Sequence, residues 1–88
     1  MNTAKYFADT GFLDLLPIAY ELAREGGYED SEMIEAVSLT FDKSRDYPPI
    51  KNRRKWFQIV FPEKLAEVRA IQARLTFETR MRLRSETD

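Results

Sequence analysis

Hydrophobic residues recur along this chain at intervals of three and four positions, the spacing that places side chains on one face of an α-helix. The segments that show this spacing or fit a short helix are residues 2–9, 12–25, 31–44, 53–61 and 62–82. Glycine is scarce and β-branched runs are few, which favours helices over strands. We therefore expect an all-α fold, a compact bundle of four to five helices. In it the third and fourth helices pack on the second, and a long C-terminal helix closes the bundle.

Individual residues predict where these helices begin and end. For the second helix the sequence predicts a boundary or bend near Asp14. If Asp14 is the N-cap, Pro17 lies in the first turn, where its missing N–H is harmless; if the helix begins at Thr10, Pro17 must kink it. Gly26 and Gly27 supply a left-handed C-cap for the same helix.

The later helices have boundary signals of their own. Asp30 or Ser31 is expected to cap the third helix, and Asn52 the fourth. Pro62 cannot continue a straight helix, but it suits the first position of a new one. The sequence therefore predicts a helix that ends at Phe61 and a separate last helix that begins at Pro62. The segment 80–88 is expected to be a frayed basic tail.

Composition narrows the class of protein. The chain of 88 residues is one domain, 1–88, and its 6 Phe, 4 Tyr and 1 Trp argue against disorder. It has neither Cys nor His, so it lacks thiolate chemistry, the commonest zinc ligand and the commonest general base. We therefore expect a protein that is not an enzyme and that holds no metal or cofactor. No signal peptide or membrane-spanning run appears, and a cytoplasmic protein without a membrane partner is expected.

The net charge of −1 hides an asymmetry between the two halves of the chain. Residues 1–50 hold four basic and ten acidic side chains, a net charge of −6, whereas residues 51–88 hold ten basic and five acidic ones, a net charge of +5. Either the halves neutralise each other in the fold, or the second half presents a basic face to a polyanion.

The densest cationic cluster lies at the predicted start of the fourth helix. Free N–H groups at a helix N-terminus, flanked by Arg and Lys, can bind phosphate. The candidate nucleic-acid contacts are Lys51, Arg53, Arg54 and Lys55, extended along the last helix by Arg69 and Arg74. Trp56 beside them either stacks on an unpaired base or belongs to the core. The alternative for the cations is a solvated surface or pairing with the acidic half.

The last helix has two apolar faces, whereas a surface helix needs only one. One face contains Leu65, Val68, Ile71 and Leu75. The other, the candidate partner or dimer interface, contains Ala66, Ala70, Ala73, Phe77 and Met81. Two faces predict either a helix buried on two sides of one bundle, or a helix that packs on its own domain and on a partner.

One segment resembles a known group of proteins. Residues 49–70 read PIKNRRKWFQIVFPEKLAEVRA. This stretch resembles segments of phage- and plasmid-encoded replication proteins of Gram-positive bacteria, in which N-x-x-x-W-F is followed by F-x-E-K-L-x-E-A-R. The resemblance covers a quarter of the chain and departs from the pattern at Val68, where Ala is expected. It implies an accessory role in DNA replication on a mobile element.

Two functions follow from these patterns. The first is a non-enzymatic nucleic-acid-binding protein, with DNA as its partner and the cations above as phosphate contacts. The second is a small protein–protein interaction module or an inhibitor of a larger protein. It would form a homodimer through its last helix or turn its acidic half toward a basic partner.

Overall fold

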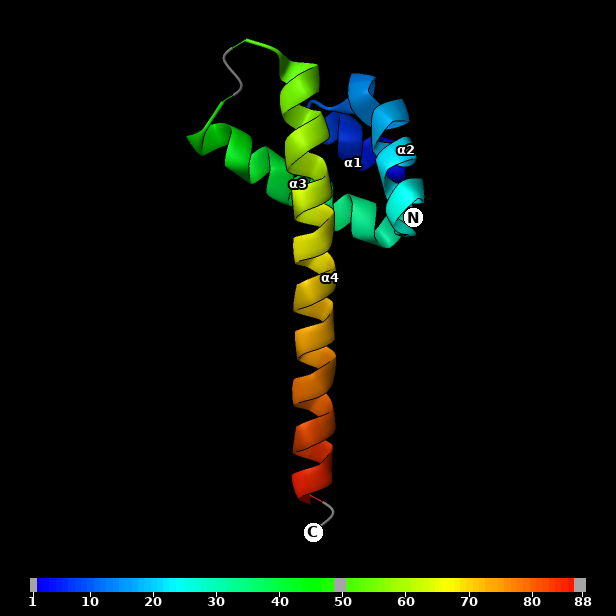
Figure 1. The fold of residues 1–88 in the computed structure, drawn as a ribbon, viewed down its shortest axis with the longest axis vertical. Coiled ribbons are helices and arrows are strands. Elements are labelled where there is room, and N and C mark those ends of the chain that lie inside the picture. Colours follow the sequence, from blue (N-terminus) through cyan, green and yellow to red (C-terminus); the bar gives the residue numbers. More distant parts are fainter. Residues whose placement is uncertain (1, 49–50, 87–88) are drawn as a thin grey trace.

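The computed structural model describes residues 2–48 and 51–86, and within these ranges the chain is helical and contains no strand (Figure 1). The elements in chain order are α1 (Thr3–Asp9), a short 3-10 helix η1 (Leu13–Leu15), α2 (Leu16–Gly26), α3 (Asp30–Asp46) and α4 (Arg53–Glu86). The all-α fold with a long C-terminal helix is therefore confirmed.

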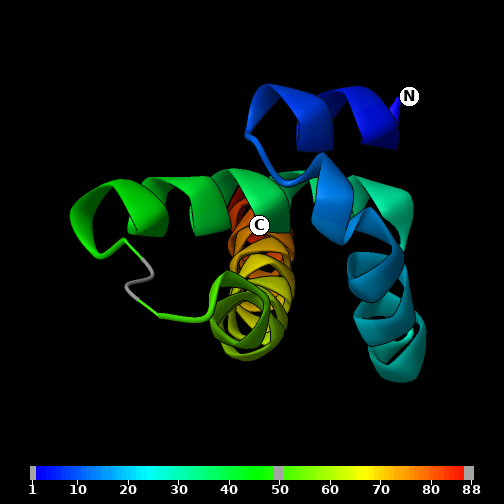
Figure 2. The ribbon, with the colours of Figure 1, turned by 90° about the horizontal axis from the view of Figure 1, so that it is seen from above.

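The central helix is α3, not α2 as the sequence suggested. Figure 2 shows α3 between α1 on one side and α4 on the other, with α2 descending beside α4. The main contacts join α3 to α4, α1 to α3 and α2 to α4. We call this assembly of α1, η1, α2, α3 and the first part of α4 the head.

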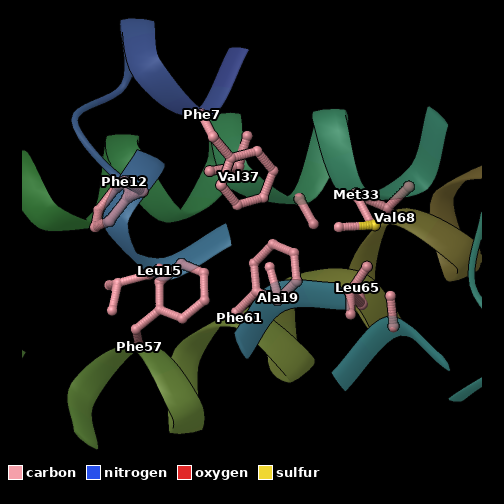
Figure 3. Close-up of a cluster of buried hydrophobic side chains, with 12 residues drawn as sticks. Phe7, Phe12, Leu15, Ala19, Met33, Val37, Phe57, Phe61, Leu65 and Val68 are labelled. Carbon is pink, nitrogen blue, oxygen red and sulfur yellow. The ribbon is translucent and has the colours of Figure 1, made fainter. Parts of the chain in front are cut away.

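The centre of the head is a cluster of aromatic rings (Figure 3). Phe57 and Phe61 of α4 stack with their ring centroids 4.8 Å apart, and Phe7 of α1 meets Phe61 edge-on at 6.0 Å. Leu65 and Val68 continue the buried side of α4 by two further turns. Burial of apolar side chains such as these contributes more to the stability of a helix in a protein than its intrinsic helix propensity does.

The predicted boundary near Asp14 is confirmed, because η1 ends at Leu15 and α2 begins at Leu16, but Asp14 is not the N-cap. The N-cap of α2 is Leu15, without a side-chain hydrogen bond, although Pro17 does lie in the first turn. Asp14 instead faces the start of α4. The C-cap is Gly27 with φ +70°, as the sequence predicted.

The N-terminus of α3 is closed by a capping box rather than by Asp30 or Ser31. Glu29 is the N-cap, and its backbone N–H donates to Oε1 of Glu32 at 2.9 Å. Asp30 accepts a hydrogen bond from the Thr3 hydroxyl at 2.9 Å instead, which fastens α1 to the start of α3.

The prediction that Pro62 separates two helices is wrong, because α4 runs through it from Arg53 to Glu86. A proline inside a helix removes one backbone hydrogen bond and costs about 3 kcal/mol. The residues on either side of it, Phe61 and Leu65, are fully buried in the head. Packing on both sides of the proline holds the helix together and offsets that cost. Asn52 accepts from the Lys55 backbone N–H at 2.9 Å, as expected for the N-cap.

The distal half of α4 leaves the head. With 34 residues α4 is about 51 Å long, and the molecule measures 56 × 26 × 23 Å. Figure 1 shows the lower half of α4 projecting alone. Every side chain from Arg69 to Arg84 is exposed. We call residues 70–86 the arm. The segment expected to be a frayed tail from residue 80 is helical through Glu86, and residues 87–88 lie outside the described ranges.

Candidate interaction surfaces

Arg53, at the start of α4, is held by the head. Its Nη1 lies 2.6 Å from a carboxylate oxygen of Asp14, and its Nη2 donates to the Gly11 carbonyl oxygen. The guanidinium also stands 4.9 Å from the centroid of the Phe12 ring. The charge of this candidate phosphate contact is therefore balanced by a carboxylate of the acidic half.

Three neighbouring cations are placed differently. Lys51, Arg54 and Lys55 are exposed, and within residues 2–48 and 51–86 none of them forms an ion pair. Arg54 lines an open groove of about 560 Å³ between the starts of α2 and α4, with Pro17 and Ile18 among its apolar walls. These three cations form the exposed basic end of α4.

Trp56 belongs to the wall of the core. The indole is half-buried and packs against the hydrophobic cluster. Its ring lies nearly parallel to that of Phe12, with the centroids 6.5 Å apart and the planes inclined by 15°. Phe12 therefore lies beside one face of the indole.

Arg69 fastens α4 to two other helices. Its guanidinium donates to both carboxylate oxygens of Glu32, at 3.0 and 3.1 Å. It also donates to the Gly27 carbonyl oxygen at 3.0 Å and lies 4.0 Å from the centroid of the Tyr28 ring. Arg69 therefore joins the C-cap of α2 to the capping box of α3. Arg69 is therefore a second candidate phosphate contact whose positive charge is balanced by a carboxylate.

The same contact shifts two pKa values. The hydrogen bond from Arg69 lowers the pKa of Glu32 below its ordinary value of 4.5, against the opposing effect of desolvation. The hydrogen bond from Glu32 raises the pKa of Arg69. Because the folded state binds a proton at Glu32 less readily than the unfolded state, this group stabilises the fold above pH 4.5. That contribution is lost as the pH falls through the lowered pKa.

We therefore expect a pH-dependent difference in unfolding free energy between the wild-type protein and Arg69→Met. The difference is largest at neutral pH and shrinks as the pH falls below 4.5, since protonated Glu32 no longer needs a cation. Urea titrations at several pH values measure it. Arg24→Met, at an exposed cation of α2, is the control and shows a difference with little pH dependence. A constant difference for Arg69→Met would contradict the role assigned to this ion pair.

Arg74 lies on the arm, apart from the other predicted cations. It pairs with Glu78 one turn away at 3.5 Å. At 1.5 Å per residue, Arg69 and Arg74 lie about 22 Å and 30 Å from Arg54 along the helix axis. The six predicted contacts are therefore not one patch: the basic end of α4, the ion pair of Arg69 and the arm are separate places.

The arm exposes both of the apolar faces that the sequence predicted. Leu65 and Val68 are buried in the head, but Ile71 and Leu75 on the same face are 46% and 57% exposed. The opposite face is exposed along its whole length, at Ala66, Ala70 and Ala73 and at two large side chains. These large side chains are Phe77, which is 64% exposed, and Met81, which is 47% exposed. The head therefore buries only the beginning of one face.

A second groove lies where the arm leaves the head. It has a volume of about 290 Å³, and its lining residues are Glu35, Ser38, Leu39, Val68 and Ile71. Leu39 and Val68 give it an apolar floor, and Glu35 places a carboxylate at its edge. Glu35 accepts from the Gln72 amide at 3.4 Å, the last hydrogen bond between α3 and α4.

Sequence reasoning missed the Glu32–Arg69 pair. Its signal was the spacing of Glu29 and Glu32, since a side chain at the third helical position that reaches back to the N-cap marks a capping box. No spacing in the sequence indicates that α4 brings Arg69 to this point, 37 residues later.

Other kinds of site are not formed by the described residues. Among them no group of acidic side chains converges in the way a metal ion needs. No helix within residues 2–48 and 51–86 combines the length and apolar character of a membrane span. Comparison of this chain with family models, with curated proteins and with solved structures found no match.

Proposed function

We propose that this protein is a non-enzymatic interaction module that binds another protein through its arm. One observation carries the proposal: Ile71, Leu75, Phe77, Met81 and Leu83 are 46–64% exposed on a helix that projects alone from the head.

Exposed apolar side chains on a solitary helix favour a partner for two physical reasons. A single helix of about 15 residues is marginally stable in water, because most helical stability in proteins comes from packing of an apolar face. Large apolar side chains gathered on an otherwise charged surface mark interaction sites. A partner that covers the arm would supply the packing that the head does not provide.

A second candidate function is nucleic-acid binding by the basic end of α4. It is favoured by Lys51, Arg54 and Lys55, whose charges are not balanced by the acidic half within the described ranges. Phosphate would lie against these cations and the first N–H groups of α4. The resemblance of residues 49–70 to replication proteins supports the same candidate.

Site-specific photocrosslinking in the cells that express the protein separates the two functions. A benzophenone amino acid is placed at Leu75 or Phe77 of the arm, at Gln58 one turn after Arg54, and at Glu21 of α2 as the control. The first function predicts protease-sensitive adducts from the arm positions and none from Glu21. The second predicts nuclease-sensitive adducts from Gln58. Arm positions that give no more adduct than Glu21 would rule out the first function.

A further inference from the structure

We infer that the partner of the arm is a second copy of this chain, which pairs antiparallel along the face of Ile71 and Leu75. The tip of each arm then docks in the groove at the root of the other arm. This inference rests on the proposed function, because it names the partner that the arm binds.

The positions on this face fit an antiparallel pair. At 100° per residue, Val68, Ile71, Leu75 and Arg82 fall within one 60° sector of α4. Val68 and Arg82 are each seven residues from Leu75, about 10.5 Å along the axis. A two-fold axis at Leu75 therefore places Leu75 against its counterpart and brings Arg82 to the axial level of Val68 of the second copy, at the groove beside α3, which covers Val68 itself.

Charge complementarity favours this arrangement. Val68 lines the groove at the root of the arm, and Glu35 stands at the edge of the same groove. Arg82 of the second copy reaches that groove, where it meets an exposed carboxylate above an apolar floor. The two-fold symmetry repeats the contact at the other end, so each dimer contains two such pairs.

The alternative pairings place like charges together. A parallel pair would set Arg82 against Arg82 and would bring no cation to Glu35. An antiparallel pair on the opposite face, with Ala70 against Phe77, would bring Arg80 alongside Arg69 of the second copy. Like charges at such positions reduce affinity and exclude the wrong register.

The shape of the molecule leaves room for the second copy. Figure 1 shows the distal half of α4 free of other elements, with the head at one end only. In an antiparallel pair the two heads lie at opposite ends of the joined arms. Each arm then contacts α4 and α3 of the other copy, the two helices that form the groove.

Sedimentation equilibrium of the purified protein tests the inference. The wild-type chain is expected to be dimeric at about 100 µM, well above the micromolar constants of weak interfaces. Leu75→Glu raises the dissociation constant about a hundredfold or more, since it puts two carboxylates face to face. Phe77→Glu on the opposite face is the matched control and leaves the dimer intact.

A charge exchange then tests the docking of the tip. Glu35→Arg and Arg82→Glu each weaken the dimer about tenfold, and the double variant restores it. A monomeric wild-type chain at about 100 µM, or a dimer abolished by Phe77→Glu and not by Leu75→Glu, would overturn the inference. So would a double variant as weak as the single ones. Protein adducts from the arm in the photocrosslinking experiment would still support the proposed function, with a different partner.

Discussion

Phe61→Ala is expected to lower the free energy of unfolding by about 3–5 kcal/mol. Phe61 is fully buried, stacks on Phe57 at 4.8 Å and meets Phe7 edge-on at 6.0 Å, so its removal empties the place where α1 and α4 come together. The loss is a large share of the roughly 5–15 kcal/mol that stabilises a domain. Urea denaturation followed by circular dichroism measures it.

The matched control is Phe77→Ala, the same substitution on the same helix. Phe77 is 64% exposed on the arm, so its truncation in the monomer changes the free energy of unfolding by less than about 0.5 kcal/mol. Comparable losses for the two variants would contradict the division of α4 into a buried part and a projecting arm.

Pro62→Ala is expected to stabilise the protein by about 2 kcal/mol. Alanine restores the backbone hydrogen bond that proline cannot donate, and it removes the clash of the ring with the preceding turn; together these are worth about 3 kcal/mol. The unfolded alanine variant has more conformational freedom than the unfolded wild-type chain, and this reduces the gain in stability by about 0.4–1 kcal/mol. At roughly 4–8 °C per kcal/mol for a domain of this size, the thermal midpoint rises by about 10 °C.

Pro17→Ala is the control for this prediction. Pro17 lies in the first turn of α2, where a helix does not use the backbone N–H, so its replacement brings no comparable gain. If Pro62→Ala left the thermal midpoint unchanged or lowered it, the continuity of α4 through residue 62 would be contradicted.

The helices themselves could be predicted from the sequence, because their signals are local. The spacing of apolar residues indicates α2, α3 and both parts of α4, although it did not predict η1 or the continuity of α4. Asn52 and Gly27 mark helix ends through backbone hydrogen bonding and a left-handed conformation. The sequence also identifies the apolar and cationic side chains of the candidate surfaces. Periodicity determines which residues share a face of α4, so the sequence alone is enough to predict both faces of the arm.

The tertiary structure decided which faces are covered and which charges are balanced. Local preference favours a break at Pro62, but the burial of Phe61 and Leu65 on either side of it outweighs the cost of one hydrogen bond. Asp14 had the chemistry of a cap and became the partner of Arg53. Such outcomes depend on contacts between residues that are distant in sequence, and neither periodicity nor propensity contains information about them.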